Sequence, residues 1–433
     1  MSSFSTALAG RLQRLMPATP AERGAALWSF AYFFSLLAGY YVLRPLRDQM
    51  GIAGGTKNLP WLFTATFAVL LIAQPIYGAL VARLPRARFI SVVYHFFVFN
   101  LIVFWLLLSF DVEKLVVARV FFVWVSVFNL FAIAVFWSFM ADLFTAEQGK
   151  RLFGFIGAGG TAGALLGPVV TIWLSAPLGT VNLLIVAAVF LELAVLCVHR
   201  IERIAEPQAQ QGQPQQQRVG GNALAGLIEL IRSPYLLGVA IWVSLLSFGA
   251  TIAYLAQANI VSATIHDPAE QTRLFAGIDL AVNLLGLATQ VFVTASLLKR
   301  FGAGIAAAAL PVAYIAGFIA LSIAPVLPVI LALQVAQRWM NFAVANPARQ
   351  IFFTVVGREE KYKAKNMIDV VVYRGSDALY AWVYQNLQAL GLKLGAVALC
   401  ALPVAVAWAV LSTVLGRTQE RLAAKTQEQE APE

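Results

Sequence analysis

Residues 115–140 read LVVARVFFVWVSVFNLFAIAVFWSFM, and this stretch decides the fold class. Its only charged side chain is Arg119. A helix rises about 1.5 Å per residue, so a helix of this length crosses the hydrocarbon core of a bilayer, which is about 30 Å thick. An apolar run this long is typical of a transmembrane helix rather than of a soluble core. The stretch is therefore predicted to span a membrane.

Similar apolar runs recur along the whole chain. Of its 433 residues, 60% are hydrophobic and only 12% are charged, about half the share of roughly 25% that soluble domains carry. We therefore predict an all-α, polytopic membrane protein with twelve transmembrane helices in two six-helix halves. The predicted spans are 25–47, 58–82, 89–110, 115–140, 152–174, 180–199, 234–260, 274–298, 303–323, 326–346, 366–390 and 394–415.

A change of composition at residues 200–233 marks the middle of the chain. The Gln- and Pro-rich run from Gln208 to Gln217 is typical of a flexible linker. It divides the predicted spans six and six, the pattern of a transporter built from two repeated halves. The predicted organisation is an N-terminal segment (1–24), a first half (25–199), the linker (200–233), a second half (234–415) and a tail (416–433).

The basic residues indicate how the chain is oriented. If both termini are cytoplasmic, 22 of the 31 Lys and Arg residues fall on the cytoplasmic side, four fall on the other side and five lie within spans. This bias fits the positive-inside rule. The net charge of +10 is then a result of orientation, so no nucleic-acid partner is predicted. We expect an integral protein of a bacterial inner membrane, with both termini in the cytoplasm.

The start of the chain has two interpretations. Residues 4–16 place Phe4, Leu8, Leu12 and Leu15 near one helical face, with basic residues beside it. This pattern predicts an amphipathic helix on the inner membrane surface. The absence of acidic residues also fits a transit peptide, which is the alternative interpretation.

Residues that usually carry catalysis or bind metals are scarce. Cys197 and Cys400 lie in separate apolar runs, and the three histidines are far apart in the sequence. Neither a disulfide framework nor a metal site is predicted. No phosphate-binding G-x-x-x-x-G-K-[ST] loop occurs. We therefore expect no cofactor, no enzyme activity and no obligatory protein partner. A membrane enzyme, or a helper in envelope assembly or lipid movement, remains an alternative of a different class.

Two motifs resemble those of the major facilitator superfamily. The loop after the second span reads Gly78-Ala-Leu-Val-Ala-Arg83-Leu-Pro-Arg86-Ala-Arg88 and is similar to the signature loop G-x-x-x-D-R-x-G-R-[KR]-[KR], with Ala82 at the acidic position. The resemblance implies that Arg83 has a gating role, and plain anchoring at the inner surface is the alternative.

The second motif lies in the fifth span. Gly154, Gly163, Gly167 and Pro168 match the pattern g-x8-G-x3-G-P, which is associated with antiporters of that superfamily. The resemblance implies a gating or coupling role for Gly163, Gly167 and Pro168. Small residues also allow two helices to approach closely, so tight packing alone is the alternative.

Three segments resemble a narrower family, the ATP/ADP translocases of plastids and intracellular bacteria. They read Tyr40-Tyr41-Val-Leu-Arg44-Pro45-Leu-Arg47-Asp48, then Phe136-Trp137-Ser-Phe139-Met-Ala-Asp142, and finally Asn346-Pro347-Ala-Arg349-Gln350 followed by Lys363-Ala-Lys365-Asn-Met-Ile-Asp369. Arg349-Gln350 stands where that family usually has Lys-Glu. The resemblance implies exchange of anionic nucleotides, ATP against ADP or NTP against NDP, by alternating access. Gating or coupling roles are assigned to Lys365, Asp369 and Asp377.

Charged side chains within spans are the candidate substrate contacts, because each costs roughly 2.5–3.5 kcal/mol at the centre of a helix. Arg338 and Arg374 lie well inside the tenth and eleventh spans. Two guanidinium groups can hold phosphate bidentately, which suits a nucleotide di- or triphosphate. Pairing of Arg374 with Asp377, three residues later, is the alternative.

Further charged and polar residues extend this candidate site. Arg44, Arg47 and Arg119 lie near the outer ends of the first and fourth spans, and Arg44 is spaced to pair with Asp48. Asp279 and Asn283 share a helical face of the eighth span, where they could bind a base or ribose or make an interhelical hydrogen bond. Within transport, the alternative to nucleotide exchange is a proton-coupled permease for another organic anion or drug, in which acids such as Glu192 and Asp377 carry protons.

Overall fold

The computed structural model describes Thr19 and residues 22–83, 86–205, 230, 232–357, 360, 364–365 and 367–430, with the side chains of 76–83, 86–89, 205 and 426–430 left out. The predicted amphipathic segment 4–16 and most of the predicted linker 200–233 lie outside the described residues. Every regular element that is described is a helix. The all-α prediction is therefore confirmed.

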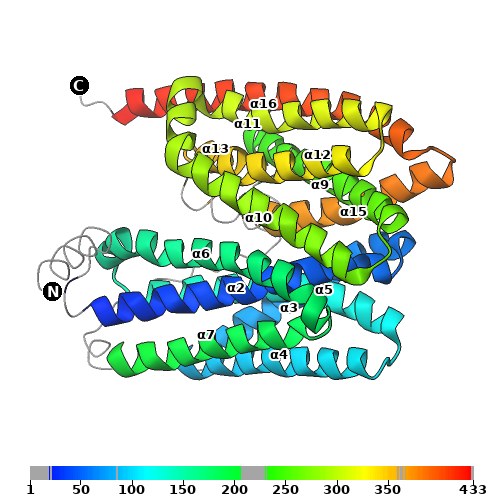
Figure 1. Ribbon diagram of the computed structural model, residues 1–433. Coiled ribbons are helices and arrows are strands. Elements are labelled where there is room, and N and C mark those ends of the chain that lie inside the picture. The colour runs from blue at the N-terminus through cyan, green and yellow to red at the C-terminus, as the bar shows by residue number, and fades with distance from the viewer. Residues whose placement is uncertain are drawn as a thin grey trace, which may run out of the picture. The chain divides into compact units, whose positions relative to one another are not determined.

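Ten of the described helices are long and apolar enough to cross a membrane. Each overlaps one of the predicted spans (Figure 1). They are α2 (Arg23–Ala53), α3 (Leu59–Arg83), α4 (Arg86–Ser109), α5 (Lys114–Leu143), α6 (Ala146–Leu178), α7 (Leu183–Ala205), α9 (Pro234–Thr264), α10 (Pro268–Phe292), α11 (Thr294–Ile323) and α16 (Leu394–Glu430).

The tenth and eleventh predicted spans are composite helices. The tenth consists of α12 (Leu327–Met340), the π-helical segment η2 (Asn341–Ala345) and α13 (Asn346–Phe352). The eleventh consists of the π-helical segment η3 (Met367–Val372) and α15 (Tyr373–Ala389). Each composite is long enough to cross the hydrocarbon core. With them, the described part of the chain provides all twelve predicted spans.

Several helix boundaries differ from the prediction, and two of the differences change where a connection lies or how far a helix extends. The eighth span was expected to end at 298, but α10 ends at Phe292 and α11 begins at Thr294. Lys299 and Arg300, expected between spans, are therefore helical, and the turn comes at Gly302, whose φ of 74° suits glycine. The last helix, α16, continues to Glu430, well beyond the predicted end of its span at 415.

The chain divides into two compact units. Unit 1 comprises Met1–Met50, Ile72–Gln215 and Asp267–Leu280. Its core combines aliphatic and aromatic side chains. Tyr32 packs edge-on against Phe136 with ring centroids 4.9 Å apart, and the hydroxyl groups of Tyr32 and Tyr94 lie 2.6 Å from each other. This buried hydrogen bond satisfies two polar groups that would otherwise be costly in an apolar core.

An ion pair joins the start of α2 to α6 within unit 1. Glu22 accepts hydrogen bonds from the backbone N–H of Thr19 and from the side chains of Gln148 and Arg151. These bonds, led by the one from Thr19, lower the pKa of the Glu22 carboxyl to about 2. Gln148 also forms a capping box with Thr145 at the start of α6. The ends of two helices are thereby fixed together outside the spans.

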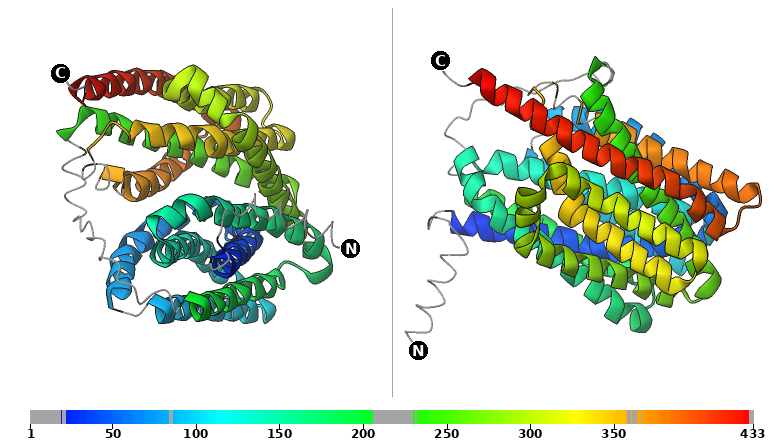
Figure 2. Two further views of the ribbon diagram at one scale, coloured as in Figure 1. Left: turned by 90° about the vertical axis from the view of Figure 1, so that its left-hand side faces the viewer. Right: turned by 90° about the horizontal axis from the view of Figure 1, so that it is seen from above.

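Unit 2 comprises Gly51–Leu71, Gln216–His266 and Ala281–Glu433. Its most extensive helix contact joins α11 to α16, which run side by side in Figures 1 and 2. Gly304 and Gly416 make this approach possible, because a Cβ added at Gly304 would lie 2.8 Å from the Cα of Gly416. Trp242 of α9 also packs here and donates a hydrogen bond to Ser412 of α16 (2.8 Å).

Candidate functional site

Arg44 and Asp279 form an ion pair inside unit 1. Arg44 lies in α2, Asp279 lies in α10, and the guanidinium nitrogen is 3.6 Å from the carboxylate oxygen. The side chains are 16% and 1% exposed, so both charges are withdrawn from solvent. The Nε of Arg44 is buried and has no hydrogen-bond partner in the described part of the chain. The arginine therefore keeps donor capacity that its carboxylate partner does not use.

The sequence spacing allowed Arg44 to pair with Asp48, but the ion pair of Arg44 is with Asp279, and Asp48 interacts with Arg44 more weakly. Asp48 instead accepts two hydrogen bonds from its neighbour Arg47, the shorter at 2.6 Å. The guanidinium of Arg47 also lies over the ring of Phe122 in α5, 5.3 Å from its centroid. Asp48 is thus held by Arg47, while the ion pair of Arg44 is with the more deeply buried Asp279.

Arg119 and Asn283 are two further predicted substrate contacts. Arg119 lies in the second turn of α5 and is half-buried in unit 1. Asn283 lies four residues after Asp279 on α10, is also half-buried, and belongs to unit 2. Their roles in substrate binding remain predictions.

Arg338 and Arg374 adjoin the two π-helical segments of unit 2. Arg338 lies in the last turn of α12, just before η2, and Arg374 is the second residue of α15, just after η3. Both side chains are half-buried. Irregular helix inside a membrane occurs where it is buried in protein or lines a cavity, and π-helical turns are frequent at functional sites. The two arginines thus sit at the interruptions of their spans.

Arg374 also has the partner that its spacing suggested. It donates a hydrogen bond to Asp377 over 3.2 Å, and its guanidinium lies 5.3 Å from the ring centroid of Tyr373. Asp377 is buried and accepts two further hydrogen bonds from α9, from Ser247 at 2.5 Å and from Thr251 at 3.4 Å. The alternative pairing with Asp377 is therefore present, and the carboxylate is well satisfied.

The sequence reasoning missed the α9 side of this polar network. Ser244, Ser247 and Thr251 recur at spacings of three and four, so they share one helical face. Ser244 contacts both Ser376 (2.8 Å) and Tyr380 (3.0 Å) of α15. That spacing of hydroxyl side chains within an apolar span is the signal that could have revealed the network in the sequence.

The two parts of the third segment quoted for the translocase resemblance, residues 346–350 and 363–369, contact each other in unit 2. Arg349 of α13 pairs with Asp369 of η3 at 3.1 Å, and Lys365 donates to the side chain of Gln350 at 2.7 Å. Arg349 and Gln350, where the family usually has Lys-Glu, thus provide the partners of both predicted coupling residues. These two contacts tie the end of one composite helix to the start of the next.

The glycines of the antiporter-like motif pack directly against α2. A Cβ at Gly163 would collide with the carbonyl oxygen of Phe34, and one at Gly167 would lie 2.7 Å from the carbonyl oxygen of Ala38. Gly154, by contrast, has open space around it. Pro168 is buried within α6. The close approach of two helices is confirmed, whereas the gating role remains a prediction. The side chain of Arg83, at the end of α3, lies outside the described residues.

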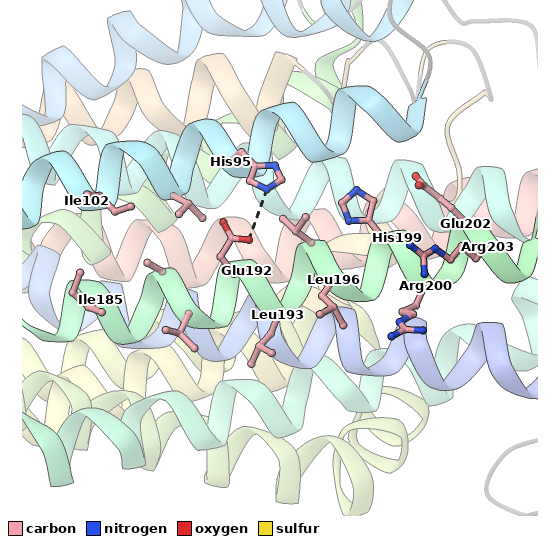
Figure 3. Close-up of a pocket in the computed structure, with 14 residues that line it drawn as sticks. His95, Ile102, Ile185, Glu192, Leu193, Leu196, His199, Arg200, Glu202 and Arg203 are labelled. Carbon is pink, nitrogen blue, oxygen red and sulfur yellow. Dashed lines mark ion pairs between the residues drawn. The ribbon is translucent and has the colours of Figure 1, made fainter.

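A groove between α4 and α7 in unit 1 holds a second set of titratable side chains. Its volume is about 1020 Å³, and it is lined mainly by aliphatic residues. Figure 3 shows His95 and Glu192 pointing toward each other across it, with Nε2 and a carboxylate oxygen 3.7 Å apart. His199, Arg200 and Arg203 lie at one end. Charged groups within spans usually mark a pathway or a partner.

The hydrogen bonding of His95 orients its ring. Its Nδ1 lies 2.7 Å from the carbonyl oxygen of Ser91, which can only accept, so Nδ1 carries a hydrogen. Nε2 faces Glu192 over 3.7 Å, which is an ion pair when the imidazole is protonated and is too long for a hydrogen bond. Among the described residues, no group of three or more His, Cys, Asp and Glu side chains forms a metal-binding cluster.

Comparison with solved structures shows which proteins share this fold. The nucleoside transporter NupG matches with a TM-score of 0.60 and 14% sequence identity, over 93% of this chain and 99% of that one. A bacterial homologue of the iron transporter ferroportin, in an inward-facing state, matches with a TM-score of 0.65 and 11% identity, over 92% and 98%. A bacterial homologue of the human lysosomal transporter Spinster matches with a TM-score of 0.54 and 13% identity, over 93% and 94%.

A comparison with sequence families is more specific. No curated protein sequence matches the chain. A family model does match. It covers residues 23–357, which is most of the chain and includes the first ten predicted spans. The chain therefore belongs to the Major Facilitator Superfamily.

Proposed function

We propose that this transporter exchanges anionic nucleotides, ATP against ADP or a similar pair. Membership of the superfamily makes it a membrane transporter of a small molecule. One observation carries the choice of substrate. Arginines lie inside or beside interrupted spans in unit 2, where Arg338 and Arg374 adjoin η2 and η3. A guanidinium in such a position suits phosphate oxygens, which it holds bidentately.

Arg44 in unit 1 supports the same substrate class. Its ion pair with Asp279 is long at 3.6 Å, and its Nε makes no hydrogen bond in the described part of the chain. A polyanion that competes with Asp279 gains a buried charge-assisted hydrogen bond without having to break a tight pair. The nucleoside transporter NupG shares the fold, and its substrate class is compatible with a nucleotide here.

Obligatory exchange follows if substrate lowers the barrier to the conformational change. In the empty carrier, Arg44 and Arg374 are held by Asp279 and Asp377. A bound polyanion that takes over these guanidinium groups loosens the pairs and lowers that barrier. This account makes counter-substrate necessary on the opposite side of the membrane.

The test is uptake of labelled ATP by the purified chain in liposomes whose lumen is either empty or loaded with ADP. Nucleotide exchange predicts uptake in the loaded vesicles alone. Equal uptake in empty and loaded vesicles would contradict exchange, and the absence of uptake from folded protein in both would contradict the nucleotide as substrate.

Proton-coupled uptake of another organic anion is a second candidate, and the His95–Glu192 pair favours it. The pair places two titratable side chains within membrane-spanning helices, and both side chains line an open groove. Under this alternative, an inward proton gradient drives uptake into empty vesicles, and a protonophore abolishes it. Glu192→Gln would remove the gradient dependence, whereas Glu113→Gln, in the connection before α5, would leave it unchanged.

A further inference from the structure

A cavity in unit 2 forms a site separate from the arginines described above. Its volume is about 320 Å³, and it lies where the C-terminal ends of α9 and α15 meet the short helix η1 (Thr56–Asn58). All of its lining residues belong to unit 2. In the predicted topology with cytoplasmic termini, η1 and the C-terminal ends of α9 and α15 lie on the outer side of the membrane.

The polar side chains of this cavity are held in place by a buried tyrosine. Tyr384 is 2% exposed, and its hydroxyl oxygen accepts hydrogen bonds from the amides of Asn259 (2.9 Å) and Gln388 (3.2 Å). Because these two bonds use the oxygen as acceptor, the hydroxyl proton is left to donate. The cavity thus offers a donor on a side chain whose position is fixed.

An unsatisfied acceptor lies in the same cavity. The side-chain oxygen of Gln385 is buried and accepts no hydrogen bond from the described residues. Buried polar atoms in native proteins almost always have a partner, so this oxygen, which has none among the described residues, can accept a hydrogen bond from a ligand. Together with the Tyr384 hydroxyl, it suits a ligand that carries both a donor and an acceptor.

Charge and size restrict that ligand further. Lys57 is the one charged residue among those that line the cavity, and its side chain is exposed. Leu255 and Pro60 provide apolar walls. The volume lies at the low end of the range for small-molecule sites, about 300–1,000 Å³. The cavity therefore has room for a nucleoside, while a chain of phosphates has to remain outside, on the side of the exposed lysine.

We propose that this cavity binds the nucleoside half of the substrate on the outer side, with its base on Gln385 and Tyr384 and its phosphate toward Lys57. Carboxamides present a donor and an acceptor side by side, and this is how Asn and Gln side chains bind the edge of adenine. The proposal rests on the nucleotide substrate class proposed above and names a recognition site for it.

The test is binding of adenosine and AMP to the purified, full-length chain, measured by titration calorimetry. Adenosine has no phosphate and therefore reports on the nucleoside contact alone. Gln385→Met keeps the length of the side chain and removes its amide, so adenosine affinity should fall about tenfold or more. Asn386→Leu, which removes an exposed amide one residue along the same helix, is the matched control and should leave the affinity unchanged.

Two further variants test the phosphate end and guard against misfolding. Lys57→Gln should remove the advantage of AMP over adenosine, and Lys393→Gln, a cation on the same predicted side, should not. Gln385→Glu keeps an acceptor but repels phosphate, so it should weaken AMP more than adenosine. Equal adenosine affinity in the wild type and Gln385→Met would overturn the proposal, as would the same loss in Asn386→Leu.

Exchange measured with the same preparations separates this inference from the proposed function. If the chain exchanges ATP for ADP but its affinity for adenosine does not depend on Gln385, the cavity is not the nucleoside site, and the proposal of nucleotide exchange is unaffected. Adenosine binding that depends on Gln385, without any exchange, supports the cavity and contradicts the exchange.

Discussion

Two ion pairs within the spans, Arg374–Asp377 in unit 2 and Arg44–Asp279 in unit 1, differ in how closely the arginine contacts the carboxylate. Asp377 in unit 2 accepts hydrogen bonds from Arg374, Ser247 and Thr251, all over 2.5–3.4 Å. Asp279 in unit 1 faces Arg44 across 3.6 Å. A fully bonded carboxylate holds its helices together, whereas a long pair gives up less when its cation turns to another anion. The comparison suggests that Asp377 stays bonded to Ser247 and Thr251 when Arg374 turns to a phosphate, and that the long Arg44–Asp279 pair exchanges partners as a whole.

The largest expected effect comes from breaking the pair in unit 1. Arg44→Gln takes the cation away from a buried carboxylate, and removal of one partner of a buried pair costs about 3–5 kcal/mol. The double variant Arg44→Gln/Asp279→Asn removes both charges and should recover most of that stability. Thermal inactivation of the detergent-solubilised protein measures this.

Transport distinguishes the two roles of Arg44. If its guanidinium binds substrate, the double variant regains stability but still fails to take up labelled ATP. A double variant that is both stable and fully active would show that Arg44 serves the fold alone.

In unit 2 the satisfied carboxylate should respond differently. Asp377→Asn keeps the shape of the side chain but places an amide N–H group among hydrogen-bond donors. The free energy of unfolding should therefore fall by about 1.5–3 kcal/mol, the usual contribution of hydrogen bonds to charged groups. Ser247→Ala should cost less, because it removes one donor and leaves the carboxylate bonded to Arg374 and Thr251. A loss for Ser247→Ala as large as that for Asp377→Asn would contradict the network as described.

A smaller effect is expected where α6 meets α2 in unit 1. Gly163→Ala adds a methyl group against the backbone of Phe34, and overpacking of this kind costs about 1–3 kcal/mol. Gly154→Ala, on the same helix but in open space, is the matched control and should be neutral or slightly stabilising. Equal thermal stability of the two variants would be inconsistent with the close helix contact.

The smallest effect concerns pH and the ion pair outside the spans. The pKa of Glu22 is lowered from 4.5 to about 2, so its contribution to stability is complete above pH 4.5 and is lost as the pH falls toward 2. Glu22→Gln should therefore lower stability at neutral pH and flatten the acid side of the profile. Thermal unfolding between pH 2 and pH 7 measures this, and a Glu22→Gln profile parallel to that of the wild type would contradict it.

The contrast between the Arg374–Asp377 and Arg44–Asp279 pairs also shows which contacts the sequence could predict. The spans follow from apolar runs, and the Arg374–Asp377 pair follows from a spacing of three residues on one helix. Arg44 was assigned to Asp48 by the same kind of local rule, but its partner Asp279 is far along the chain, where only tertiary packing could identify it. The π-helical segments η2 and η3 have no composition signal that marks them within their spans.

The central claim is that arginines within the spans hold the phosphates of an exchanged nucleotide. The most direct test is uptake of labelled ATP into ADP-loaded liposomes by the wild type, Arg374→Ala and Arg374→Lys, each shown to be folded. The account predicts rapid uptake by the wild type, partial uptake by Arg374→Lys, which keeps the charge but loses the bidentate geometry, and none by Arg374→Ala. Uptake by Arg374→Ala at the wild-type rate would contradict it.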